Sequence, residues 1–217
     1  MERYSTLAGE GTVEVIIKKS RFIGLASPIS CPEKAQERIA LVRDSEPEAS
    51  HHVFAYSLAM LPGRGPWVLS RMSDDGEPSG TAGRPVMGVV ERSGLQDVLV
   101  VVTRYFGGTL LGASGLVRAY TKAAAEALEK APKAEQVRSF RYSWRVPYGL
   151  YGSAMNALSH LEGVAIEGSD FTTEVDIAFT APASLHERLY RQLQELVQGE
   201  PVWETQEEMY LECLIGG

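Results

Sequence analysis

The sequence predicts an α+β protein of two domains, the first covering residues 1–133 and the second residues 134–217. Three observations favour this assignment. Short apolar or alternating runs, which indicate strands, are mixed along the chain with apolar residues at helical spacing. The 217 residues suffice for one large domain or two of ordinary size. The segment 131–135, with one proline and two charged residues, has the composition of a linker.

The first domain is expected to contain strands and helices in turn. Alternating apolar residues on both sides of a polar turn at Lys19 and Ser20 predict a hairpin. Pro32 suits the first turn of a helix, and Gly94 suits a helix end. A turn rich in proline and glycine at residues 61–66 separates two further strands. The expected strands span residues 12–18, 21–29, 51–60, 67–72 and 98–103. The expected helices span residues 32–44, 82–92 and 116–130.

The second domain has a regular order of elements. Helices are expected at residues 150–161 and 184–197, where leucines recur on one face and Gly163 and Gly199 follow the ends. Strands are expected at residues 137–146, 164–168, 172–179 and 202–214. The resulting order, βαββαβ, is the ferredoxin-like plan.

Charge is unevenly distributed along the chain, whose net charge is −7. Up to residue 134 there are 16 Lys and Arg against 15 Asp and Glu, and from residue 135 there are 5 against 13. The net charge disfavours simple electrostatic binding to a polyanion, but residues 1–134 could carry a basic patch. Arg138, Arg141 and Arg145 lie close together in the otherwise acidic second part.

The sequence predicts a cytoplasmic protein. Its apolar runs are too short to cross a bilayer, and the first residues lack the apolar core of a signal peptide. Cys31 and Cys213 are far apart and form no CxxC motif, so we expect both to be reduced, buried and inert.

A glycine-rich turn follows the most apolar strand of the chain. Residues 98–103 predict a buried strand and residues 116–130 an amphipathic helix, with glycines and Arg104 between them. Unpaired amides, a positive helix end and small residues together suit an anion. The turn matches neither the P-loop nor the GxGxxG pattern, and tight packing of the turn on its own sheet explains the glycines equally well. The candidate anion- or nucleic-acid-binding residues are Arg84, Arg104, Tyr105, Phe106, Gly107, Gly108, Gly112 and Arg118.

A long polar loop at residues 73–86 is the second unusual segment. Its carboxylates could hold Mg²⁺ or Ca²⁺ or act as a base, although the spacing is not that of an EF-hand. The alternative is local: acidic and hydroxyl side chains form turn hydrogen bonds, and Thr81 caps the following helix. We favour this alternative for each acid taken singly. The residues of the polar loop motif are Asp74, Asp75, Gly76, Glu77, Ser79, Gly80 and Thr81.

Other reactive side chains predict neither a metal site nor a catalytic centre. His51 and His52 are adjacent on an expected strand, so they point to opposite faces and cannot easily bind one metal. Ser114 has no histidine that the sequence places beside it. We therefore assign no catalytic residue, no metal ligand and no cofactor.

The polar loop SDDGEPSGTAGRPV and the segment VVVTRYFGGTLLGASGLVRAYTKA together resemble the signature of the IMPACT/YigZ family. The resemblance covers nearly the whole chain, with an IMPACT domain first and the smaller second domain of bacterial members after it. Ser114 stands where the family pattern has glycine, and His52 where it has asparagine. The matching positions are Asp74, Asp75, Gly76, Glu77, Pro78, Ser79, Gly80, Thr81, Ala82 and Gly83, then Arg104, Tyr105, Phe106, Gly107, Gly108, Gly112, Arg118, Ala119 and Tyr120.

The resemblance implies a fold and a field of function. It implies that the first domain is like the second domain of ribosomal protein S-five and the second domain is ferredoxin-like. Eukaryotic members act in translational control, by competing for the activator of a starvation-responsive kinase, and bacterial members are inferred to bind nucleic acid or the ribosome.

Three hypotheses for the function follow. The first is a non-enzymatic, translation-associated regulator that binds RNA, the ribosome or a translation-regulatory protein through the glycine-rich surface, and no membrane. The second is an enzyme acting on a phosphorylated or nucleotide ligand, with Mg²⁺ held by Asp74, Asp75 or Glu77. The third is a module that binds only proteins, through an exposed apolar patch.

Overall fold

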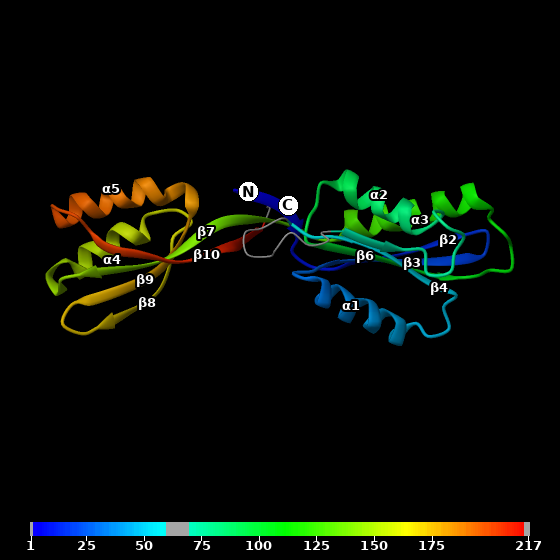
Figure 1. The fold of residues 1–217 in the computed structure, drawn as a ribbon, viewed down its shortest axis with the longest axis horizontal. Helices are drawn as coiled ribbons and strands as arrows, with labels where there is room; N and C mark the ends of the chain where they lie inside the picture. Colours follow the sequence, from blue (N-terminus) through cyan, green and yellow to red (C-terminus); the bar gives the residue numbers. More distant parts are fainter. Residues whose placement is uncertain (1, 60–69, 215–217) are drawn as a thin grey trace. The chain divides into compact units, whose positions relative to one another are not determined.

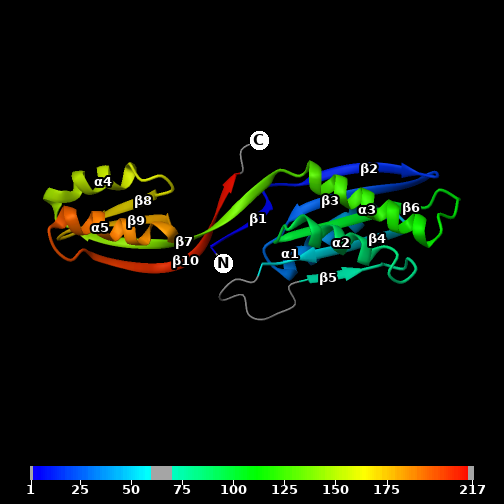
Figure 2. The same ribbon diagram turned by 90° about the horizontal axis from the view of Figure 1, so that it is seen from above.

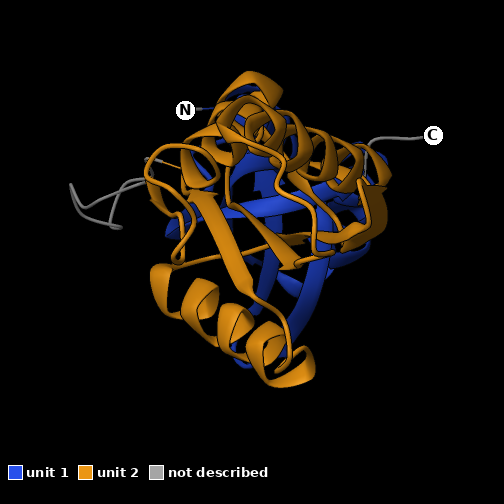
Figure 3. Cartoon of the chain, turned by 90° about the vertical axis from the view of Figure 1, so that its right-hand side faces the viewer, with its two compact units in different colours: residues 1–3, 136–213 blue, residues 4–135, 214–217 orange. Residues whose placement is uncertain are grey.

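The computed structural model describes residues 2–59 and 70–214. By its internal contacts the chain divides into two compact units (Figure 3). The N-terminal unit consists of residues 4–135, and the C-terminal unit consists of residues 136–213 together with residues 2–3. Both units combine helices with a sheet whose paired strands are antiparallel wherever their register is defined. No helix among the described residues is long and apolar enough to cross a membrane.

The N-terminal unit is built on a five-stranded sheet with the strand order β2-β3-β6-β4-β5. The strands are β2 (Gly11–Ile17), β3 (Ser20–Pro28), β4 (His51–Ser57), β5 (Ser70–Ser73) and β6 (Val98–Tyr105). The helices are α1 (Pro32–Ser45), α2 (Gly83–Ser93) and α3 (Ala113–Lys130). Helices α2 and α3 cover one face of the sheet and α1 covers the other (Figures 1 and 2).

Strand β6 lies at the centre of this sheet, and its first five side chains are all apolar. Val98, Val100 and Val102 pack into the core under α2 and α3. Leu99 and Val101 alternate with them and pack into the core that α1 covers. A strand buried on both faces reads as a continuous apolar run, which is the pattern of residues 98–102. The chain that leaves β6 is therefore fixed to a rigid support.

The C-terminal unit has the element order β7, α4, β8, β9, α5, β10. Its sheet has β7 (Lys133–Val146) between β9 (Val175–Pro182) and β10 (Val202–Leu214), with β8 (Ala165–Phe171) beyond β9. Strand β1 (Arg3–Leu7) also pairs with β7. One-turn helices η1 (Tyr148–Leu150) and η2 (Ala183–Leu185) precede α4 (Tyr151–Ser159) and α5 (His186–Val197). The core beneath α4 and α5 is centred on Trp144, Tyr142 and Phe179.

Several element boundaries differ from those predicted. Strand β1 was not predicted, and the expected linker at residues 131–135 is partly strand, because β7 begins at Lys133. Strand β6 continues two residues beyond the expected end, since Arg104 pairs with Phe22 of β3 on one side and with His51 of β4 on the other. The expected turn at residues 61–66 and the start of the strand expected at 67–72 lie outside the described residues.

The cysteines and the cap of α2 also differ from expectation. Both cysteines are free, but Cys31 is partly exposed and Cys213 is exposed, so the prediction that they are buried was wrong. Thr81 does not cap α2, because its hydroxyl donates to the carbonyl oxygen of Pro78 at 2.6 Å. The side chain of Asp74 caps this helix instead.

Candidate functional site

Asp74 organises the polar loop and the start of α2. Its Oδ1 accepts hydrogen bonds from the amides of Ala82 (3.0 Å) and Gly83 (2.7 Å), and its Oδ2 accepts one from Gly80 (2.9 Å). The amides of Ala82 and Gly83 are among those that a helix start leaves without partners, whereas Gly80 belongs to the preceding loop. Burial opposes the charged carboxylate, but the three amide donors outweigh burial and lower the pKa of Asp74.

Asp75 joins the polar loop to β4 and to α1. Its Oδ2 accepts a hydrogen bond from the amide of His52 at 2.6 Å, and its Oδ1 pairs with Arg43 at 2.6 Å. Its own carbonyl oxygen lies 2.8 Å from Nδ1 of His51. Asp75 has φ of +43°, a conformation that costs energy for a residue with a side chain. These contacts to two other elements hold it there.

Glu77, Arg104 and Tyr120 form a buried polar cluster. Glu77 Oε1 accepts hydrogen bonds from Arg104 Nη1 at 2.5 Å and from the Tyr120 hydroxyl at 2.7 Å. The side chains of Glu77 and Arg104 are 3% and 6% exposed. Burial, and secondly the hydrogen bond to Glu77, raise the pKa of Tyr120, so the phenol stays a donor. Arg104 Nε is buried without a hydrogen-bond partner among the described residues. The cluster thus joins the polar loop to β6 and α3.

His51 and His52 lie opposite Arg104 and Thr103 of β6, and they face opposite sides of the sheet. His51 Nε2 lies 3.8 Å from Glu77 Oε1, beside the buried cluster. His52 is buried, and its Nδ1 lies 3.2 Å from the Thr103 hydroxyl. Burial lowers the pKa of His52. In the described part of the chain, no group of three or more His, Cys, Asp or Glu side chains is placed to hold a metal ion.

The glycine-rich turn packs tightly against the hairpin turn between β2 and β3. The amide of Gly107 donates to the hydroxyl of Ser20 at 3.1 Å, and the amide of Phe106 donates to the hydroxyl of Ser50 at 3.3 Å. A Cβ on Gly107 would lie 2.0 Å from the carbonyl carbon of Lys19, which no other residue type allows. Two amides of the turn are therefore already satisfied by neighbouring side chains.

The predicted arginines have different roles in the structure. Arg104, expected at the mouth of the turn, is committed to Glu77, because β6 continues through it and buries it. Arg84 is exposed and lies 3.5 Å from Glu91 on the same helix. Arg118 is exposed on α3 and forms no ion pair with any described residue. Of the three, only Arg118 is available to an anion.

The aromatic pair after Arg104 is divided between two environments. The Tyr105 hydroxyl donates to Glu46 Oε2 at 2.5 Å, and the guanidinium carbon of Arg21 lies 4.8 Å from the Tyr105 ring centre. Phe106 is 50% exposed, with the guanidinium carbon of Arg104 at 5.6 Å from its ring centre. Phe106 is thus accessible to a ligand, whereas Tyr105 is engaged with the protein.

The sequence prediction missed the two cations nearest the turn, Lys18 and Lys19. They form the hairpin turn between β2 and β3, with φ of +47° and +68°. Both are exposed, and neither forms an ion pair with a described residue. Their position in a predicted hairpin turn was visible in the sequence, but nothing local indicated that this turn meets Gly107, about ninety residues further on.

The fold and the site define a class: a two-unit α+β protein whose first unit joins a polar loop to a glycine-rich turn through a buried Glu–Arg–Tyr cluster. The model described as Impact N-terminal domain matches residues 18–128, which span all of these features, and the chain belongs to this family.

Relatives support the same assignment. The chain is 45% identical over 149 residues to "IMPACT family member in pol 5'region" of Thermus thermophilus, covering 68% of this chain and 77% of that protein. It is 34% identical over 184 residues to "IMPACT family member YigZ" of Escherichia coli, covering 85% and 88%. A solved structure titled "Crystal structure of an hypothetical protein" is 30% identical, with a TM-score of 0.63 over 95% of this chain and 98% of that one.

Proposed function

We propose that this chain is a non-enzymatic regulator associated with translation, which binds ribosomal RNA through the surface around the glycine-rich turn. Family membership supports the field of function, since the resemblance implies that eukaryotic members act in translational control. The proposal includes two finer features of the fold. The N-terminal unit is taken to be like the second domain of ribosomal protein S-five, and the C-terminal unit to be ferredoxin-like, which its strand order β10-β7-β9-β8 supports.

The observation that carries the proposal is a group of cations that form no ion pair with any described residue, beside a helix whose N-cap residue is a glycine. Lys18 and Lys19 are exposed next to the glycine-rich turn, and Arg118 is exposed on the second turn of α3. The N-cap residue of α3 is Gly112, at φ of +73°, and it has no side chain that could cap the helix. Lysine and arginine side chains and the first amides of a helix are common ligands of phosphate.

Exposed apolar side chains in the same turn support contact with an unpaired base. Phe106 is 50% exposed and Leu110 is 83% exposed. Aromatic rings stack on bases of single-stranded RNA with little regard to sequence. The phosphate contacts would come from the lysines, and the stacking from Phe106.

Fluorescence anisotropy with a labelled single-stranded RNA and with purified ribosomes tests the proposal. The logarithm of the affinity should fall linearly with the logarithm of salt concentration, and the double variant Lys18→Gln/Lys19→Gln should lower that slope by about 1 to 2. Lys34→Gln is a matched control, because Lys34 is an exposed lysine that pairs with Glu37 on α1. Absence of binding at low salt to either probe, or a slope that the double variant leaves unchanged, would refute RNA binding at this surface.

A second candidate, binding to a ribosome-associated protein, is favoured by the C-terminal unit. Each of the three arginines on β7 pairs with an acid: Arg138 with Glu208, Arg141 with Glu167 and Arg145 with Asp176. A face whose cations are neutralised in this way attracts phosphate weakly. Binding to ribosomes that resists salt, and that the double variant Lys18→Gln/Lys19→Gln leaves unchanged, would identify this alternative.

The geometry does not favour the enzyme hypothesis, because each acid of the polar loop already has protein partners. Asp74 is held by backbone amides, Asp75 by Arg43 and His52, and Glu77 by Arg104 and Tyr120. A magnesium ion needs several carboxylate or water oxygens directed at one point. We therefore do not propose magnesium-dependent chemistry at this loop.

A further inference from the structure

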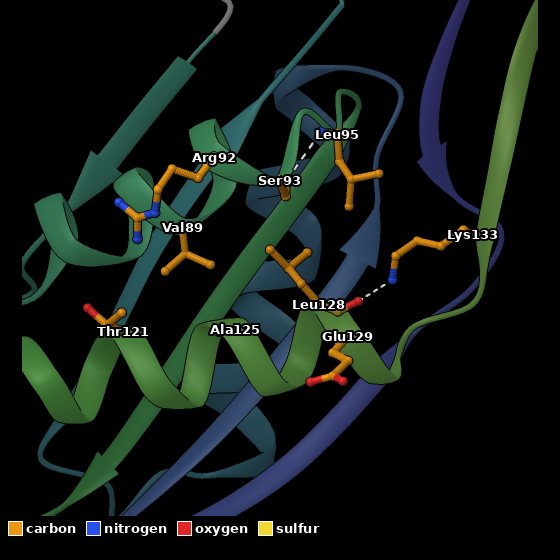
Figure 4. Close-up of a pocket in the computed structure, with 9 residues that line it drawn as sticks. All are labelled: Val89, Arg92, Ser93, Leu95, Thr121, Ala125, Leu128, Glu129 and Lys133. Carbon is orange, nitrogen blue, oxygen red and sulfur yellow. Dashed lines mark hydrogen bonds between the residues drawn. The ribbon is translucent and has the colours of Figure 1, made fainter.

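A shallow groove of about 360 Å³ lies between α2 and α3 of the N-terminal unit. Its lining includes Val89 and Leu95 on one side and Ala125 and Leu128 on the other (Figure 4). It shares no residue with the polar loop or the glycine-rich turn. This volume lies near the lower limit for pockets that bind small organic molecules. The walls of such pockets are mostly apolar and carry a few polar groups. The groove therefore suits a small molecule with an apolar body.

One end of the groove is formed by Arg92 and Thr121, which Figure 4 shows on either side of Val89. Arg92 is exposed, and it forms no ion pair with any described residue. Its guanidinium lies over Gly88 of the same helix. A Cβ built on Gly88 would be only 3.1 Å from Arg92 Nη1. A guanidinium matches the planar geometry of a carboxylate, and Thr121 at the same end of the groove supplies a hydroxyl donor.

The other end carries Lys133 and Glu129, whose charges compensate each other. Lys133 Nζ donates to the carbonyl oxygens of Ala131 (2.7 Å) and Leu128, near the end of α3. Two of its three donors are thus used within the protein. The Glu129 carboxylate lines the same end. The groove therefore has one positive end, at Arg92, and one end that is close to neutral.

We propose that this groove binds a small carboxylic acid with an unbranched apolar chain. The carboxylate contacts Arg92 and Thr121, and the chain covers Val89, Ala125 and Leu128. The assignment follows from the single positive end, the apolar walls and the volume. It does not depend on the function proposed above, because no residue of the RNA-binding surface takes part.

Titration of the ¹⁵N-labelled full chain with octanoate, followed by two-dimensional NMR, tests this inference. Saturable shifts in residues 89–95 and 121–129 are expected. Octan-1-ol, which lacks the charge, and octylammonium, which reverses it, should bind about tenfold more weakly or worse. The absence of a saturable shift at octanoate concentrations up to about 10 mM overturns the proposal, as does equal binding of all three compounds.

Three variants separate the groove from non-specific adsorption. Arg92→Gln should weaken octanoate binding about tenfold, whereas Arg84→Gln, on the same helix but outside the groove, should leave it unchanged. Ala125→Trp places a large side chain in the groove and should abolish binding. Ala125 is exposed, so the variant is expected to fold, and its NMR spectrum checks this directly. Octanoate binding that survives Ala125→Trp in a folded protein, or that ignores Arg92→Gln, refutes the site.

Discussion

Glu77 Oε1 and Arg104 Nη1 are 2.5 Å apart in a pair that is almost fully buried, although 27 residues separate the two in sequence. Tyr120 of α3 donates to the same oxygen. One carboxylate thus holds together the polar loop, the central strand and the long helix. Both signature segments of the family contact this oxygen atom. They therefore share a structural role that does not depend on a ligand.

The first prediction concerns this pair. Glu77→Ala should lower the free energy of unfolding by about 3–5 kcal/mol, because it leaves the buried guanidinium of Arg104 unpaired. The double variant Glu77→Leu/Arg104→Met should recover much of that loss, since apolar side chains of similar size need no partner. Urea denaturation of Glu77→Leu, Arg104→Met and the double variant measures the coupling. Strictly additive losses would contradict a direct interaction between the two side chains.

The second prediction concerns Asp74 as the cap of α2. Asp74→Ala removes the acceptor of three amides and should cost about 1–2 kcal/mol of stability, whereas Asp74→Asn, which keeps one acceptor oxygen, should cost less. Asp44→Ala is the matched control, because Asp44 is an exposed acid in the last turn of α1. Thermal unfolding followed by circular dichroism measures all three. Equal effects of Asp74→Ala and Asp44→Ala would argue against the cap.

The third prediction separates crowding from backbone strain in the glycine-rich turn. Gly107→Ala places a Cβ 2.0 Å from backbone atoms of Lys19, so the two turns must move apart. In Gly108→Ala the added Cβ has no atom within 4 Å, so the only cost is the backbone strain of φ at +79°, about 1 kcal/mol. Gly107→Ala should therefore destabilise the protein more than Gly108→Ala, and it should also weaken RNA binding by displacing Lys18 and Lys19. The reverse order of stabilities would contradict the packing described here.

The positions of most helices and strands along the chain were predictable from the sequence, because these positions depend on local periodicity. The apolar run at residues 98–102, the helix that starts at Pro32 and the helix end at Gly94 all follow from short-range rules. Strand β1 was missed because five residues with mixed polarity give no clear period. The end of β6 was placed too early because pairing with β3 and β4, and not local sequence, decides where that strand stops.

Which site residues are free to bind a ligand was much less predictable than which residues lie near the glycine-rich turn. The sequence places Arg104 beside the glycine-rich turn, but it does not show that Glu77 reaches Arg104 from another loop. It likewise gives no sign that Ser20 satisfies the amide of Gly107. Charge pairing and hydrogen bonding across long sequence separations depend on tertiary structure. For this reason Lys18 and Lys19, and not Arg104, are the cations left available near the turn.

The last prediction is a pH dependence that arises from His52. Burial is the largest influence on its pKa and lowers it, opposed in part by the nearby Asp75 carboxylate. A histidine of the unfolded chain titrates near pH 6.5, so below that pH the unfolded chain binds more protons than the folded one. The stabilising contribution of neutral His52 is therefore complete above pH 6.5, and it is lost as the pH falls through the lower folded pKa.

The variant His52→Asn, which carries the residue of the family pattern at this position, removes this titration. The free energy of unfolding in urea, measured between about pH 7.5 and 5.5 where histidines titrate, should fall less steeply with acidification in His52→Asn than in the parent chain. His160→Asn, an exposed histidine of the C-terminal unit, should leave the parent slope unchanged. If His52→Asn retained the full slope while His160→Asn flattened it, the pH dependence would belong to the C-terminal unit, and burial of neutral His52 would contribute nothing to stability.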